Sequence, residues 1–129
     1  MLDMEALIQG LAEMALSEEF KTDITLGKAR EDCTFKGNKY RITVLSDVLL
    51  RFEYSETGKF NDYPTIFAIN RNFAKKPVFT VKQDEKYINI TNDYFILEYS
   101  KEKPYIASKL VPDSNLRITL KGTDKLWYF

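Results

Sequence analysis

The chain has 129 residues, of which 44% are hydrophobic and 29% are charged, and its 19 basic residues balance its 19 acidic residues. This composition predicts one ordinary folded domain and excludes a disordered chain. The balanced charge gives no sign of a nucleic-acid-binding surface, which would show clustered lysine and arginine and a high pI, so we expect no nucleic-acid partner.

The chain has no histidine and a single cysteine, Cys33. The missing histidine excludes histidine zinc sites and both the Ser-His-Asp and the Cys-His arrangements, and we expect no metal and no cofactor. A single cysteine cannot form an internal disulfide, so Cys33 is predicted to be a small buried side chain.

No apolar run reaches the roughly 20 residues that span a bilayer, and no signal-peptide pattern is visible. We therefore expect no membrane partner and a cytoplasmic location.

Residues 1–20 are predicted to contain an amphipathic helix that begins near Asp3. Asp3 is the expected N-cap, with Glu5 in the first turn. Such a short helix is marginal alone, so its apolar stripe must pack on its own domain, on a second chain or on a further domain. Homo-oligomer contacts are one option. The apolar stripe repeats at three- and four-residue steps and consists of Met4, Leu7, Ile8, Leu11, Met14 and Ala15.

From Thr22 onward the pattern changes to a period of two, which predicts strands. Strands at near-regular spacing with no helix between them predict a mainly β, antiparallel β-sandwich over residues 21–129. The expected strands are marked by Ile24 and Leu26, by Cys33 and Phe35, by residues 40–45, 48–54, 78–81, 87–90, 95–99 and 116–120, and by a strand that ends at residues 70–73.

Charged and aromatic residues alternate densely between residues 51 and 73. Two acids, Glu53 and Asp62, and two arginines, Arg51 and Arg71, lie among rings that could bury them. Because buried charges persist only when they are paired and hydrogen-bonded, we predict a polar network beneath a loop crossing. Alternatively, the two arginines could hold a sugar or a phosphate through their guanidinium groups; ion pairing with the two acids is the preferred interpretation.

The same stretch follows the pattern R-x-E-Y, a short turn, F-x-D-x-P-T and then N-R-x-F. It resembles the N-terminal β-sandwich domain of glycoside hydrolase family 31, which contains α-glucosidases and α-xylosidases. With its looser strand pattern from Tyr40 to Trp127, the likeness covers about two thirds of the chain. The matching residues are Arg51, Glu53, Tyr54, Phe60, Asp62, Pro64, Thr65, Asn70, Arg71 and Phe73.

The resemblance implies a sandwich of the galactose mutarotase-like supersandwich type that precedes a catalytic (β/α)₈ barrel. It also implies that the parent enzyme cleaves α-linked glucosides or xylosides with retention, using two barrel aspartates and no metal. The implied partners are the barrel of the same parent chain and its α-linked oligosaccharide substrate. The domain would brace the barrel, and the loop of residues 55–65 is the candidate contact with the rim of its active site.

Two carboxylate pairs could be nominated for catalysis, since a retaining glycosidase needs two carboxyl groups about 5–5.5 Å apart. Glu53 with Asp62 belongs to the expected polar network, and Asp84 with Glu85 belongs to an exposed turn. A chain of 129 residues also cannot contain a (β/α)₈ barrel. We therefore expect no catalytic residue in this chain.

Two other functions stay open on the sequence alone. A carbohydrate-binding module could use exposed rings, and a protein-interaction sandwich could have no relation to sugars. The chain ends on three aromatic residues, and we expect that it is cut at a domain edge, with uncovered apolar surface that promotes self-association. The candidate ring clusters are Tyr94, Phe95, Tyr99 and Tyr105, and Trp127, Tyr128 and Phe129.

Overall fold

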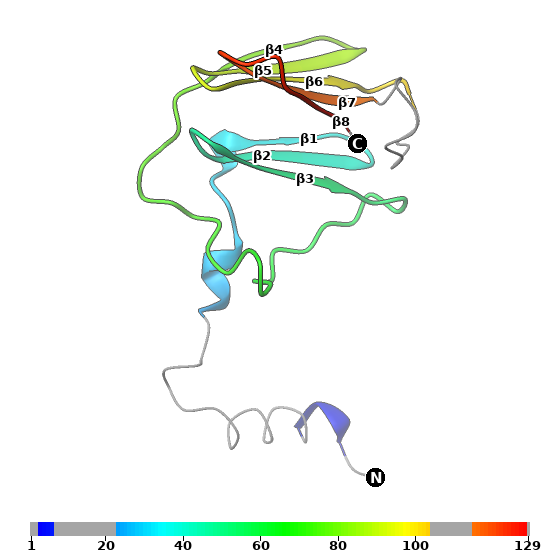
Figure 1. Ribbon diagram of the computed structural model, residues 1–129. Helices are drawn as coiled ribbons and strands as arrows, with labels where there is room; N and C mark the ends of the chain where they lie inside the picture. The colour runs from blue at the N-terminus through cyan, green and yellow to red at the C-terminus, as the bar shows by residue number, and fades with distance from the viewer. Residues whose placement is uncertain (1–2, 7–22, 104–114, 129) are drawn as a thin grey trace.

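The computed structural model describes residues 3–6, 23–103 and 115–128 and is mainly β, as predicted (Figure 1). Its elements in chain order are the 3₁₀ helices η2 (Ile24–Gly27) and η3 (Glu31–Cys33) and the strands β1 (Thr34–Lys36), β2 (Tyr40–Ser46), β3 (Leu49–Tyr54), β4 (Thr80–Gln83), β5 (Tyr87–Thr91), β6 (Phe95–Ser100), β7 (Leu116–Leu120) and β8 (Leu126–Tyr128).

The strands form two antiparallel sheets in which every neighbour in space is also a neighbour in sequence. The first sheet has the order β1-β2-β3 and the second has the order β4-β5-β6-β7-β8. Figure 1 shows the two sheets stacked one above the other, with the long segment of residues 55–79 running below the first sheet before it climbs to β4. The first sheet therefore has two faces to cover, one toward the second sheet and one toward this segment.

The core lies between the two sheets and follows from the two-residue period of the strands. Ile42 and Val44 from β2 meet Ile88 and Ile90 from β5, and all four side chains are fully buried. Each such burial contributes about 1.5–3 kcal/mol relative to exposure. The ring of Tyr99 in β6 joins the sheets, with its centroid 4.6 Å from that of Tyr40 and 5.4 Å from that of Phe52.

The other face of the first sheet carries the residues that alternate with this core. Arg41 in β2 lies opposite Glu53 in β3 in the strand register, and Thr43 lies opposite Arg51. This face is covered by η2 and by residues 55–79, which are joined where the amide of Arg71 donates a 2.7 Å hydrogen bond to the carbonyl of Leu26.

Two predicted strands are wrong, and local side-chain hydrogen bonds explain both. Ile24 and Leu26 lie in the 3₁₀ helix η2, where the Asp23 carboxylate accepts from the amide of Thr25 at 2.9 Å. The strand predicted to end at residues 70–73 is a loop, in which the Asn70 side chain accepts from the amide of Asn72 at 2.8 Å. Aspartate and asparagine offer the backbone these turns in competition with a sheet ladder.

The predicted N-terminal helix lies mostly outside the described residues. Residues 4–6 are helical, and the Asp3 carboxylate accepts from the amides of Glu5 and Ala6 at 3.1 and 3.4 Å, as expected of an N-cap. The rest of that helix stays a prediction, as does the supersandwich type of the two sheets.

Gly27 should be intolerant of a side chain because of the loop that crosses it. A Cβ atom built on Gly27 would overlap the carbonyl oxygen of Asp62 and would lie 2.8 Å from the nitrogen of Pro64. We predict that Gly27→Ala lowers the free energy of unfolding by about 1–3 kcal/mol, the range of overpacking substitutions. Chemical denaturation measures this change.

The matched control is Gly122→Ala, where a Cβ atom would meet nothing within 4 Å but the backbone has a φ of +74°. That strain costs about 1–2 kcal/mol and should leave the loop in place. Amide chemical shifts of residues 62–71 should therefore move in Gly27→Ala and stay constant in Gly122→Ala. Unchanged shifts in the Gly27 variant would contradict the close approach.

Candidate functional site

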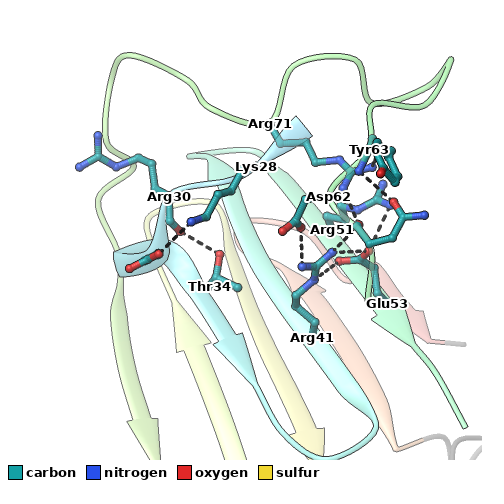
Figure 2. Close-up of polar contacts among 11 residues, drawn as sticks. Lys28, Arg30, Thr34, Arg41, Arg51, Glu53, Asp62, Tyr63 and Arg71 are labelled. Carbon is teal, nitrogen blue, oxygen red and sulfur yellow. Dashed lines mark hydrogen bonds and ion pairs between the residues drawn. The ribbon is translucent and has the colours of Figure 1, made fainter. Parts of the chain in front are cut away.

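Arg41 is the centre of a charged cluster between β2, β3 and the loop (Figure 2). Its Nε and Nη2 atoms donate to the two carboxylate oxygens of Glu53 at 2.6 and 2.9 Å. Its Nη1 atom donates to Asp62 at 2.6 Å, and Nη2 also reaches the carbonyl of Asn61 at 3.0 Å. The forked contact with Glu53 is the strong bidentate geometry of guanidinium and carboxylate. One side chain thus ties two strands to the loop.

Glu53 lies between two guanidinium groups. Besides its two bonds to Arg41, it accepts from Nη2 of Arg51 at 3.3 Å, and its side chain is 16% exposed. Burial raises the pKa of Glu53, but the hydrogen bonds and charge of Arg41 and the charge of Arg51 together outweigh burial, so the pKa lies below the ordinary value of a glutamate. Glu53 is consequently ionised at neutral pH and is poorly suited to donate a proton.

Arg71 is the most deeply buried charged residue of the cluster, at 3% exposed. Its Nη2 atom donates to the carbonyl of Tyr63 at 2.8 Å and its Nη1 atom to the carbonyl of Asn61 at 3.3 Å. Within the described residues it has no bonded carboxylate. Burial and the positive charges of Arg51 and Arg41 lower the pKa of Arg71. The guanidinium group of Arg71 therefore holds the loop by bonding two main-chain carbonyl groups of the loop.

Phe60 covers the cluster from the loop side. The Cζ atom of Arg41 lies 5.2 Å from the centroid of the Phe60 ring, and the Nζ atom of Lys36 lies 5.4 Å from it. Both separations fall within the reach of cation–π attraction. The ring thereby shields the ion pairs while it stabilises two cations.

The structure brings together five of the ten residues of the predicted motif. Arg51, Glu53, Phe60, Asp62 and Arg71 all lie around Arg41, in a network of polar and ring contacts beneath the loop. Of the remaining five, Tyr54 and Thr65 line a second hollow together with Arg51, Glu53, Phe60 and Arg71. Pro64 lies beside Gly27, Asn70 in a local turn and Phe73 half-buried in the loop.

The sequence interpretation missed Arg41, which binds both acids. Of the two arginines expected to pair with the acids, Arg51 does bind Glu53, whereas Arg71 bonds carbonyl groups instead. The missing signal is the strand register. Pairing the two strands around the break at Ser46–Asp47 places Arg41 opposite Glu53, and such cross-strand pairs of opposite charge are favourable.

A partly open cavity of about 150 Å³ lies against the cluster, between η2 and the outward face of the first sheet. Arg41, Arg51 and Arg71 all contribute to its wall. The Nε atoms of Arg51 and Arg71 are buried and have no hydrogen-bond partner. The described residues contain no group of three or more His, Cys, Asp or Glu side chains that could hold a metal ion. The site therefore offers hydrogen-bond donors and positive charge.

The second nominated carboxylate pair has a structural role. The carboxylate of Asp84 accepts from the amides of Lys86 and Tyr87, both at 2.8 Å, and these bonds lower its pKa. It closes the turn between β4 and β5, as expected of an exposed turn.

No protein-family model matches this chain, and a comparison with curated proteins finds no match either. The likeness to glycoside hydrolase family 31 therefore rests on the residue pattern alone. In the part of the chain that the structure describes, no helix combines the length and apolarity needed to cross a membrane.

Removing Arg41 should destabilise the domain strongly, because it leaves Glu53 largely buried with one weaker partner. Loss of one member of a buried ion pair costs about 3–5 kcal/mol. Since Arg51 still reaches Glu53, we predict that Arg41→Ala lowers the free energy of unfolding by about 2–3 kcal/mol, just below the range for fully broken buried pairs. Urea denaturation monitored by circular dichroism measures it.

Lys39→Ala is the matched control, because Lys39 forms a 2.8 Å ion pair with Glu56 in which both side chains are more than half exposed. Exposed pairs contribute about 0–1 kcal/mol. Equal losses of stability in the two variants would show that the cluster does not fix the loop.

The lowered pKa of Glu53 predicts a loss of stability in acid. A carboxylate whose pKa is lower in the folded state stabilises the fold above its unfolded pKa, and this contribution disappears as the pH falls through the folded pKa. The free energy of unfolding should therefore decrease as the pH falls below 4.5, the ordinary value for glutamate. In Glu53→Gln this decrease should be shallower. Denaturant titrations at successive pH values test it, and an unchanged slope in the variant would contradict the assignment.

Proposed function

We propose that this chain is the non-catalytic N-terminal β-sandwich domain, of the galactose mutarotase-like supersandwich type, of a retaining family 31 α-glycosidase. In this proposal the domain braces the catalytic (β/α)₈ barrel of the same parent chain, in the cytoplasm, and lends a loop to the rim of its active site. The substrate, an α-linked oligosaccharide, binds to the parent enzyme. The observation that carries the proposal is an exposed apolar tip on a loop that the charged cluster holds in place.

The tip of the loop is a tight turn with two large apolar side chains facing outward. Thr65 and Ala68 exchange backbone hydrogen bonds of 3.4 and 2.9 Å, and between them Ile66 is 88% exposed and Phe67 is 100% exposed. Adjacent exposed apolar side chains of this size are typical of a contact with another protein surface. Burying them would contribute about 25 cal/mol for each Å² of apolar area.

The turn is not free to collapse onto its own domain. The carbonyl of Tyr63, two residues before the turn, accepts from Arg71, and the amide of Arg71 is bonded to Leu26. One end of the tip is thus fixed by the buried guanidinium of Arg71 and the other by the main-chain amide of the same residue. A loop presented in one position loses less conformational entropy when it docks than a mobile loop does.

The cluster itself is structural in this proposal, and the reacting acids belong to the barrel. Glu53 is held as a carboxylate by two arginines, and Asp62 is bonded to Arg41 at 2.6 Å. A retaining mechanism needs one carboxylic acid with a raised pKa as proton donor. The lowered pKa of Glu53 has the opposite direction.

The carbohydrate-module alternative is less favoured because its first row of rings does not form on the surface. Phe95 and Tyr99 are each 3% exposed and lie in the core, whereas Tyr94 is 55% exposed. Tyr105 lies outside the described residues. Trp127 is 46% exposed. Calorimetry with maltose, isomaltose and xylose oligomers tests the module directly: we expect no binding, and millimolar or tighter binding would favour the alternative.

The decisive test of the proposal is the coding sequence after Phe129. We expect it to continue into a (β/α)₈ barrel with paired aspartates. A stop codon directly after Phe129 would contradict the proposal.

A second test addresses the docking loop in the full parent chain. The double variant Ile66→Ser/Phe67→Ser should leave the folding of this domain intact, because both side chains are exposed, and should weaken its docking to the barrel. We expect lower glycosidase activity and faster proteolysis between the two domains. Tyr94→Ser, an exposed ring on the second sheet, is the matched control and should change neither. Equal behaviour of the two variants would argue against docking through the tip.

A further inference from the structure

Two buried guanidinium donors in the charged cluster have no acceptor. The Nε atoms of Arg51 and Arg71 are both inaccessible to solvent and make no hydrogen bond within the described residues. Arg71 as a whole is 97% buried, because its exposed fraction is 3%. Nearly all buried donors in folded proteins have a partner, and a charged donor is especially costly to leave without one. The pair therefore points to a missing acceptor.

The cavity beside these donors carries an excess of positive charge. Five cationic side chains line it, against the three carboxylates of Glu31, Glu53 and Asp62, which leaves two positive charges in excess. The cationic residues are Lys28, Lys36, Arg41, Arg51 and Arg71.

The local ion pairs show which of these cations lack a counter-ion. Lys28 is paired with Glu31 at 3.1 Å, and Arg41 uses both remaining acids. In the described part of the chain, Arg71 and Lys36 have no acid of their own, and the nearest partner of Lys36 is the ring of Phe60. The excess charge is thus carried by Arg71 and Lys36, which both line the cavity.

The cavity has room for a small ion. Its volume of about 150 Å³ is several times the roughly 10–15 Å³ that one water requires. Figure 2 shows the three arginine side chains reaching this region from β2, from β3 and from the loop. A neutral sugar would not neutralise the excess charge, whereas a doubly charged oxoanion would.

We propose that this cavity binds a divalent oxoanion such as phosphate or sulfate, held between the guanidinium groups of Arg51 and Arg71. The anion lies against these two guanidinium groups and neutralises the two excess charges; because both Nε atoms are covered, the two side chains shift on binding so that their Nε–H groups donate to it. Guanidinium groups are suited to this role because their planar forks match the oxygens of phosphate. The anion would lie between strand β3 and the loop, and its binding should stabilise the fold by mass action. The site is independent of the glycosidase proposal.

The experiment is a titration of the 129-residue chain with sodium phosphate, with sodium chloride at the same ionic strength as the reference. The readouts are the Nε–H resonances of Arg51 and Arg71 in a ¹⁵N–¹H spectrum and the thermal midpoint. We expect saturable shifts of both resonances and a midpoint that rises by about 4–6 °C at a tenfold excess over Kd. Sulfate should act like phosphate, and acetate should bind more weakly.

Arg51→Lys keeps the positive charge but removes the Nε–H donor and the fork. It should weaken phosphate binding at least about tenfold, the loss expected for one charged hydrogen bond. Lys75→Ala, whose side chain is 84% exposed and faces Asp47, should bind as the native chain does. If Arg51→Lys fails to fold, the shifts of the native Nε–H resonances decide the question alone. Equal effects of phosphate and chloride, acetate binding as tight as phosphate binding, or unchanged binding by Arg51→Lys would each overturn the proposal.

Discussion

The guanidinium group of Arg41 joins the long connecting segment to the first sheet. Arg41 donates to Glu53 on the neighbouring strand, to the carboxylate of Asp62 and to the carbonyl of Asn61. The tip of the loop has no apolar anchor of its own, because its large side chains Ile66 and Phe67 face outward. Its attachment to the sheet is therefore made largely of directed polar bonds. Such bonds define a geometry even where they add little net stability compared with apolar packing.

The first sheet shows how one alternating pattern serves two purposes. Along β2, the residues of one parity, such as Ile42 and Val44, build the core with the second sheet. Arg41, of the other parity, builds the charged face. Because side chains alternate across a strand, a slip of one residue in the pairing would place charges in the core and apolar residues under the loop. The ion pair of Arg41 with Glu53 and the buried isoleucines therefore favour the same register.

The sequence was sufficient to predict those strands in which the apolar residues of the two-residue period are buried in the core. A strand was predicted at residues 87–90, and Ile88 and Ile90 within it are both fully buried. The same criterion failed at Ile24 and Leu26, because the Asp23 side chain bonds the backbone locally and closes a 3₁₀ turn. The period of apolar residues says nothing about hydrogen bonds between a side chain and the nearby backbone. At residues 24–27 such a bond competes with strand pairing, and the 3₁₀ helix forms.

For the charged cluster, the sequence predicted which residues would gather but not how they would pair. A pattern within residues 51–73 pointed to the acids and to Arg51 and Arg71, while their main partner Arg41 lies outside that stretch and is joined to it through the strand register. Pairing is a property of the fold in three dimensions, and it also determines which charges are left over. With Arg41 bound to both acids, Arg71 is left to carbonyl groups.

The leftover charge distinguishes this cluster from a purely structural one. Three arginines against two acids exceed what neutralisation requires, and the deepest of them, Arg71, is also the one without a bonded carboxylate. A cluster that served only to fasten the loop could bond these carbonyl groups with a neutral donor and would not need a buried charge that lacks a counter-ion, since burying an unpaired charge is costly. A buried guanidinium with an unused donor beside a cavity is instead the arrangement expected when the final acceptor is a separate ion. In that case the same residues that fasten the loop also sense the anion, and occupancy of the cavity would rigidify the tip formed by Ile66 and Phe67.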